Sequence, residues 1–258
     1  MNPGRLWLRA TTGCQRRAAR WLARRPLALP GGRPIVSFSF DDFPRSALHN
    51  AGAILERFGV AGTYYTALGL AGRTTECGEM FALDDLPGLL ARGHELGCHT
   101  FDHHPAWATA PAAFESSVRR NAHALARSAP GARFATLSYP ISYPRPGTKR
   151  RVARHFPCCR GGGQRFNTGT IDANYLSAFF LEQSRGDPEA VKRITLANFA
   201  AGGWLIFATH DVCAQPSSFG CVTDFFTQVV RFAVDSGAEI LPVGRAWETL
   251  RARAASGS

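Results

Sequence analysis

The sequence predicts an α/β protein built on parallel strands, with a barrel of the (β/α)7 type favoured over an open sheet. Short β-prone apolar runs alternate with segments of helical period from residue 35 to residue 241. Such alternation is typical of parallel sheets joined by right-handed crossovers. About seven repeats within roughly 220 residues favour a barrel, although an open sheet has the same alternation.

Each predicted strand is a short run of apolar, β-branched or aromatic residues bounded by turn-forming residues. The run at residues 35–40 predicts a buried strand, and the run at 204–209 is the strongest of the set. The predicted strands are residues 35–40, 62–68, 95–98, 135–139, 157–160, 204–209 and 239–241.

Apolar residues recur near a 3.6-residue period in the segments between these strands. Leu48, Leu55 and Phe58 define the first helix, and Gly59 ends it. The predicted helices are residues 45–58, 83–92, 111–128, 148–155, 189–201 and 222–236.

The charge of the chain is concentrated at its beginning. The formal net charge is +11, and residues 1–40 carry eight arginines and no acidic residue. We assign residues 1–34 to a basic N-terminal arm and residues 35–250 to one folded domain, separated by the breaker cluster at 30–34. The excess charge favours anionic partners such as nucleic acid or lipid head groups, and a solvated, poorly ordered arm is the equal alternative.

Ala18, Trp21 and Leu22 would form one face of a short helix that ends before Pro26. This helix would make weak contact with an anionic membrane surface, or it would pack on the body of the protein. The basic residues lack interleaved aromatic residues and no nucleic-acid-binding motif is present, so we expect no specific nucleic-acid partner.

No segment is apolar for long enough to cross a membrane, and the N-terminus lacks the apolar core of a signal peptide. The chain has seven cysteines, an odd number, and Cys158 and Cys159 are adjacent, which does not fit a disulfide framework. We therefore expect a cytoplasmic protein with reduced thiols. No cysteine pair has the spacing of a structural zinc site.

Two adjacent carboxylates, Asp41 and Asp42, follow the strand predicted at residues 35–40. In a regular strand their side chains would point to opposite faces, so both reach one site only if the chain turns there. The pair Phe43-Pro44 favours such a turn. The alternative is that these residues cap a helix, where Asp is common.

His99 and His103 have the spacing of metal ligands on a helical turn or tight loop. Two histidines and one aspartate suffice for a divalent metal that keeps an open position for water. Thr100 would orient a ligand or the loop, and Asp102 would hold an imidazole tautomer. The alternative is a pair of core or partly exposed histidines.

His210 follows the strand at residues 204–209 and precedes Asp211. A histidine at a strand end is suited to general acid or base catalysis because its pKa lies near neutrality. The alternative is a structural histidine paired with Asp211 or with a backbone carbonyl. These residues and the pair Tyr139-Pro140 all fall at carboxyl ends of predicted strands, where parallel α/β folds place their active sites.

Together these residues resemble the polysaccharide deacetylase family, metal-dependent esterases that remove N- or O-acetyl groups from chitin, peptidoglycan and related glycans. The run Ser39-Phe40-Asp41-Asp42 is similar to the family's first motif, Thr-Phe-Asp-Asp. The run from His99 to His103 is similar to its second motif, His-Ser/Thr-x-x-His. The resemblance spans residues 35 to 241 and implies a distorted barrel of about seven strands.

The resemblance also implies roles for individual residues. Asp41 would be the catalytic base and His210 the general acid. The metal ligands would be Asp42, His99 and His103.

The later motifs depart from the family pattern. Many members have Arg-x-Pro and an aromatic residue in the third motif, where Arg pairs with the base, but Ser138 stands in place of that Arg here. Arg145 and Arg165 are the candidates to replace it. The orienting Asp of the fourth motif is matched loosely by Asp172, and Ala208 in place of a Leu suggests a roomier acyl pocket.

We therefore expect a hydrolase acting on carbon–nitrogen bonds other than peptide bonds, or on the corresponding esters, with an acetylated oligosaccharide or polysaccharide as substrate. Zinc suits the ligand set first, and cobalt, manganese or nickel suit it as well. Tyr139, Pro140 and Ile141 would bind substrate, with a backbone N–H there holding the oxyanion. The alternative, which Ser138 favours, is a catalytically inactive glycan-binding protein with the same fold.

Overall fold

The computed structural model of the chain describes residues 3–141 and 143–256, with side chains from residue 12 onward, so the first two residues of the predicted arm lie outside it. Its central sheet has eight strands. They are β2 (Ile35–Phe40), β3 (Thr63–Thr66), β6 (Glu95–Cys98), β7 (Leu137–Ser138), β8 (Cys159–Arg160), β10 (Phe179–Phe180), β11 (Trp204–Thr209) and β12 (Glu239–Ile240).

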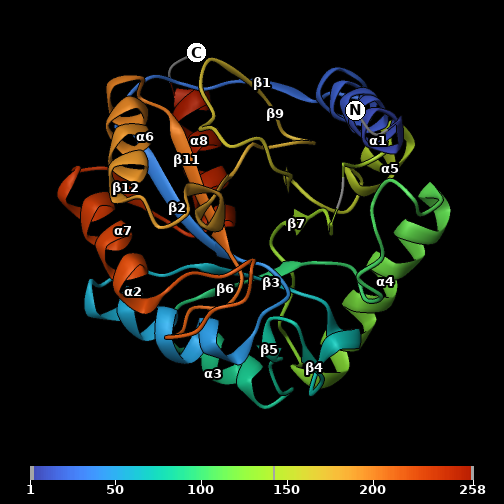
Figure 1. Cartoon of the computed structure of the whole chain (residues 1–258), viewed down its shortest axis with the longest axis horizontal. Helices are drawn as coiled ribbons and strands as arrows, with labels where there is room; N and C mark the ends of the chain where they lie inside the picture. The colour runs from blue at the N-terminus through green and yellow to red at the C-terminus, as the bar shows by residue number, and fades with distance from the viewer. Residues whose placement is uncertain (1–2, 142, 257–258) are drawn as a thin grey trace.

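The strand order is β10-β11-β2-β3-β6-β7-β8, with β12 pairing to β2 beside this path. Every pairing within this sheet is parallel, as the alternation of strands and helices predicts. The sheet curls into a distorted (β/α)7 barrel, and the helices lie around its outside (Figure 1). The predicted fold class is therefore confirmed.

Helices α2 to α7 occupy the predicted connections, α4 with the predicted bounds, whereas α8 was not predicted. The helices are α1 (Pro3–Trp21), α2 (Ala53–Arg57), α3 (Asp85–Ala91), α4 (Pro111–Ser128), α5 (Pro146–Val152), α6 (Pro188–Ala200), α7 (Thr223–Asp235) and α8 (Val243–Ser256). In the helix predicted at residues 45–58, Ala47–Gly52 forms π-type turns ahead of α2. Two short 3-10 segments, Leu68–Leu70 and Leu181–Ser184, complete the helical structure of the described residues.

Several elements were not predicted. The strands β4 (Thr74–Thr75) and β5 (Gly78–Glu79) form a hairpin, and β1 (Pro26–Ala28) pairs antiparallel with β9 (Thr170–Asp172). Strands of two or three residues depend on a partner segment rather than on a local pattern, so periodicity does not reveal them. By contrast, α8 does carry a helical period in its buried residues, which are Val243, Ala246, Trp247 and Leu250.

Strands β2 and β11 are buried along their whole length, as expected for the centre of a parallel sheet. Phe38 of β2 stacks on Phe207 of β11 with ring centroids 5.6 Å apart, and Phe226 of α7 packs against Phe38 at 5.8 Å. Burial of each such side chain contributes about 1.5–3 kcal/mol of transfer free energy. The β2–β11 register, which pairs Phe40 with Thr209, fixes the two strand ends that lead to Asp41 and His210.

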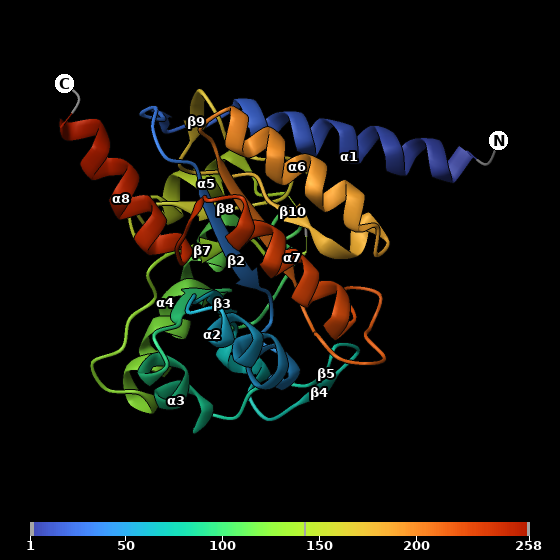
Figure 2. The ribbon, with the colours of Figure 1, turned by 90° about the vertical axis from the view of Figure 1, so that its left-hand side faces the viewer.

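The N-terminal segment is helical over a longer stretch than predicted, and its helix packs on the body of the protein. Ala19 of α1 is fully buried, whereas Trp21 at the end of the helix and Leu22 just after it are exposed. The amino-terminal half of α1 reaches past the rest of the ribbon (Figure 2).

Within the described part of the chain, none of the helices combines the length and apolarity that a membrane span requires. All seven cysteines are free thiols.

Candidate metal centre and active site

A cavity of about 730 Å³ lies where β2, β6, β7, β8 and β11 end. Its volume is in the range of small-molecule binding sites. The predicted site residues that line it are Asp41, Asp42, His99, His103, Tyr139, Ile141 and His210. Segments that are far apart in the sequence therefore meet at one rim of the barrel.

Asp42, His99 and His103 lie close enough to bind one ion. Oδ1 of Asp42 is 3.3 Å from Nε2 of His99 and 2.8 Å from Nε2 of His103. One ligand atom from each residue lies within 4.8 Å of the others. Asp42 has a φ of 62° and His103 one of 52°, a left-handed conformation that is strained for residues other than glycine and tends to mark functional sites.

The residues present fit a divalent cation. Oδ1 of Asp42 is buried without a hydrogen-bond donor, which is costly unless a cation is nearby. Nδ1 of His99 donates to the carbonyl of Ser138 at 3.0 Å, so its Nε2 presents a lone pair toward Asp42. Burial raises the pKa of Asp42, but the imidazoles of His103 and His99 outweigh this effect and hold its pKa below the usual range.

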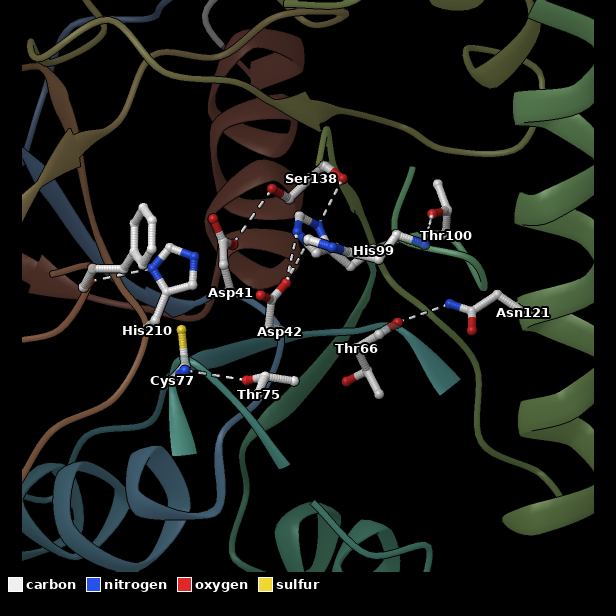
Figure 3. A network of polar contacts seen from close by, with 12 residues as sticks. Asp41, Asp42, Thr66, Thr75, Cys77, His99, Thr100, Asn121, Ser138 and His210 are labelled. Carbon is white, nitrogen blue, oxygen red and sulfur yellow. Dashed lines mark hydrogen bonds and ion pairs between the residues drawn. The ribbon is translucent and has the colours of Figure 1, made fainter. Parts of the chain in front are cut away.

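Asp41 turns away from Asp42 and toward Ser138 (Figure 3). The guanidinium of Arg160, at the end of β8, forms a buried ion pair with Oδ1 of Asp41 and also donates to the hydroxyl of Ser138. Burial raises the pKa of Asp41, but the positive charge of Arg160, followed by His99 and His210, lowers it below its usual value. Asp41 is therefore a carboxylate at neutral pH, as a base must be.

Arg160 was missed in the sequence, and neither of the two candidate arginines reaches Asp41. Arg145 donates to the carbonyl of Trp107, and Arg165 donates to the hydroxyl of Ser177. Because β7 and β8 are parallel neighbours that pair Ser138 with Arg160, an arginine on either strand can reach the same carboxylate. The signal was available, since Arg160 ends the strand predicted at residues 157–160.

His210 lies on the other side of the two aspartates from His99 (Figure 3). Its Nδ1 is 3.2 Å from the carbonyl oxygen of Phe219, which only accepts, so this nitrogen carries hydrogen and Nε2 remains for the cavity. Asp211 is bound instead by the N–H and hydroxyl of Ser217, at 2.7 and 2.6 Å. Asp211 therefore shapes the loop that presents the Phe219 carbonyl.

Thr100 and Asp102 were predicted to support the metal ligands, and only Thr100 contacts the ligand loop in that way. The hydroxyl of Thr100 accepts from the N–H of His103 at 3.2 Å and so shapes the ligand loop. The carboxylate of Asp102 accepts hydrogen bonds from the hydroxyl of Ser117 and the guanidinium of Arg120, so it does not hold the imidazole of His99 or His103.

Asp172 does not line the cavity either. Its side chain pairs with Lys149 at 2.7 Å and accepts from the N–H of Arg25 and of Asn174. It therefore does not orient His210, because its acceptor positions are used elsewhere. The backbone carbonyl of Phe219 occupies the place expected for an orienting carboxylate.

The predicted substrate segment contributes unequally. Tyr139 lines the cavity, but its hydroxyl donates to Asn174 and its N–H to the carbonyl of Arg160. Pro140 has no N–H and is absent from the cavity lining. Ile141 lines the cavity with an exposed side chain and a φ of 60°, a strained conformation for a β-branched residue. Its N–H has no acceptor among the described residues.

Glu182 is a further cavity residue that the sequence did not reveal, because it follows the unpredicted strand β10. Its Oε2 is buried without a hydrogen-bond partner among the described residues. Burial raises the pKa of Glu182 to about 7, with the nearby charge of Asp41 adding to the effect. A carboxyl group of this kind carries a proton over part of the neutral pH range.

Comparison with known proteins is consistent with this geometry. Residues 29–156 match the family model described as polysaccharide deacetylase, whereas a search of curated protein sequences finds no match. The CE4 domain of a multidomain xylanase from the hindgut metagenome of Trinervitermes trinervoides is similar in structure, with 16% identity and a TM-score of 0.61. The match covers 84% of this chain and 91% of that chain.

Two further structures are similar. The chitin deacetylase from Colletotrichum lindemuthianum is 16% identical, with a TM-score of 0.60 over 84% of this chain and 89% of that chain. A CE4 family pseudoenzyme from Bacillus anthracis is 10% identical, with a TM-score of 0.56 over 84% of this chain and 66% of its own. Over residues 29–156 the chain belongs to the polysaccharide deacetylase family, and it has the fold that these CE4 proteins share.

Proposed function

We propose that this protein is a metal-dependent hydrolase that removes acetyl groups from a glycan or a glycolipid sugar. The observation that supports this most directly is the buried Asp41–Arg160 pair beside the Asp42, His99 and His103 cluster. A binding protein needs a cavity, but it has no need of an ionised carboxylate held next to a metal-ligand set. Catalysis by proton transfer requires that arrangement.

Asp42, His99 and His103 would hold the cation, with zinc the first choice for two imidazoles and a carboxylate, and cobalt, manganese or nickel as alternatives. When bound, such an ion polarises the acetyl carbonyl and lowers the pKa of water. The Ser138 carbonyl contributes by fixing the tautomer of His99.

The remaining steps belong to side chains and backbone of this chain. Asp41 accepts the proton of the attacking water, and Arg160 holds its carboxylate in place. The N–H of Ile141 donates to the oxygen of the acetyl group as negative charge develops on it. His210, as an imidazolium with hydrogen on both ring nitrogens, donates the Nε2 proton to the leaving nitrogen or oxygen and keeps the Nδ1 hydrogen on the Phe219 carbonyl, so that acetate and a deacetylated sugar result.

An inactive glycan-binding protein is the competing proposal, and one of the similar structures is indeed a pseudoenzyme. In this sequence, the feature that favoured an inactive protein was Ser138, which stands where many family members have the arginine that pairs with the base. Because Arg160 pairs with Asp41 from the neighbouring strand, that support is lost.

The experiment is an assay of acetate release from acetylated chitooligosaccharides, with and without a chelator, together with metal analysis of the purified protein. We expect His99→Ala to lose bound metal and activity together, and Asp41→Asn to retain metal and lose turnover. Normal turnover in Asp41→Asn, or in the chelator-treated protein, would refute the mechanism. If none of the acetylated oligosaccharides releases acetate, the result would favour the inactive glycan-binding protein.

A further inference from the structure

Arg16, which α1 supplies, lines the same cavity as Asp41, Asp42 and His210. The helix precedes the segment that matches the family, residues 29–156. One wall of the cavity therefore comes from a helix that precedes the family match, just as the residues from Arg160 to Phe219 that line it follow the match.

The structure fixes α1 against the domain with buried polar contacts. Lys149 is fully buried, and its Nζ donates to the carbonyls of Ala19 and Leu22 at 2.6 and 2.8 Å. These carbonyls lie at the end of the helix, where backbone acceptors have no intrahelical partner. Nζ also pairs with Asp172 at 2.7 Å, so the cation that caps α1 is itself neutralised by β9.

A second set of contacts holds the chain that follows α1. The guanidinium of Arg25 donates to the carbonyls of Ala153 and Phe156 at 3.2 and 3.1 Å. Asn174 donates to the carbonyl of Ala23 at 2.9 Å, and β1 pairs with β9. The position of Arg16 at the cavity is therefore set by contacts on the carboxyl side of the helix rather than by a free arm.

Four arginines of the N-terminal segment form no ion pair with the described acidic residues. None of the acidic residues, all of which the structure describes, forms an ion pair with Arg16, Arg17, Arg20 or Arg24. Burial, and then the positive charge of Arg20, lower the pKa of Arg165. Exposed arginines elsewhere, such as Arg57, Arg73 and Arg119, likewise form no ion pair with these acidic residues, so what distinguishes Arg16 is its place at the cavity.

The cavity lining carries both signs of charge, with Glu76 and Glu182 besides the two aspartates, and Arg16 besides Arg160. Glu76 lines the cavity and lies between β4 and β5, which are far from α1 in both views of the ribbon (Figures 1 and 2). Tyr143 and Tyr175 line the cavity as well, with ring centroids 6.3 Å apart. Aromatic rings and an unpaired guanidinium together suit a sugar that carries a negative charge.

We propose that Arg16, with Arg20 and Arg165 adding to the field behind it, binds an anionic group on the glycan, a carboxylate or a phosphate. The inference deepens the proposed function, because it names acidic glycans as the substrate class. α1 is then a substrate-binding wall that selects for charge at the entrance of the site.

The test is a binding measurement that needs no catalysis. The full-length protein is titrated by calorimetry at low ionic strength with three probes: tetragalacturonate for a carboxylate, glucose 6-phosphate for a phosphate, and fully N-acetylated chitotetraose as the neutral reference. The variants are Arg16→Gln and, as a matched control, Arg17→Gln, which removes the same charge from an exposed neighbour that does not line the cavity. Circular dichroism checks that both variants are folded.

We expect one anionic probe to bind about tenfold more tightly than chitotetraose, and Arg16→Gln to remove this preference while Arg17→Gln keeps it. The probe that shows the preference identifies the anionic group. Equal binding of all probes, or an equal loss in both variants, would overturn the proposal. Binding to phosphatidylglycerol vesicles is measured as well. If both variants weaken vesicle binding equally and neither anionic probe binds, the proposal of a glycan site is overturned in favour of a membrane surface.

The two proposals fail separately. Acetate release without any preference for anionic probes refutes the anion site and leaves the hydrolase intact. Arg16-dependent binding in a protein that releases no acetate refutes the hydrolase and leaves the anion site intact.

Discussion

Replacing Arg160 by Met is the sharpest test of how the catalytic carboxylate is held. Both partners are buried, with Asp41 5% exposed and Arg160 1% exposed. Removing one member of a buried ion pair leaves an uncompensated charge and costs about 3–5 kcal/mol of unfolding free energy. In a chain of this size the melting temperature should then fall by roughly 6–20 °C. Since Asp41 also loses its orientation, we expect kcat/KM for acetate release to fall about 100-fold.

The double variant Ser138→Arg with Arg160→Ser separates loss of the pair from general damage. Ser138 and Arg160 are register partners on β7 and β8, and both side chains already contact Oδ1 of Asp41. An arginine at position 138 would stand where many family members have theirs. We expect it to recover most of the melting temperature and of the turnover that Arg160→Met loses.

The assays are calorimetric unfolding and acetate release, with Arg145→Gln as a control, because among the described residues Arg145 donates to the carbonyls of Trp107 and Ala108 and not to Asp41. The control should retain wild-type turnover. If Arg160→Met melts and hydrolyses like the wild type, Arg160 does not hold the base. A double variant no better than the single one would show that the strand carrying the arginine matters, contrary to our reasoning.

Three further predictions concern the surroundings of the site. Because burial raises the pKa of Glu182 to about 7 from 4.5, the folded state binds its proton more tightly, so Glu182→Gln should gain stability relative to wild type between pH 5 and pH 8. Urea unfolding at both pH values measures this, and an unchanged difference would contradict it. Lys149→Met leaves Asp172 and the carbonyls at the end of α1 without their cationic partner, so trypsin should cut the α1 segment faster. Unchanged cleavage would show that the other contacts suffice to hold α1. Ser217→Ala frees the Asp211 loop that presents the Phe219 carbonyl to His210, and should lower kcat about tenfold with little change in KM, as steady-state kinetics would show.

Much of the fold could be read from local patterns. Strands β2, β6 and β11 and helix α4 have the predicted bounds, because the apolar runs of β2 and β11 and the 3.6-residue period of α4 are strong local signals, and Gly93 ahead of β6 marks a break. The strands β1, β9 and β10 were missed, since each has only two or three residues and exists through pairing with a distant segment. Their absence from the prediction also hid Glu182, which directly follows β10 and its adjoining residue Leu181.

The sequence by itself determined the parallel architecture, the rim at which the site lies and the grouping of Asp42 with His99 and His103. These follow from strand–helix alternation and from motifs confined to a few neighbouring residues. Only the tertiary structure decided that Arg160 pairs with Asp41, that a backbone carbonyl orients His210, and that α1 brings Arg16 to the cavity. The physical reason is that a charge finds its partner across space, between strands and helices whose register no local pattern encodes.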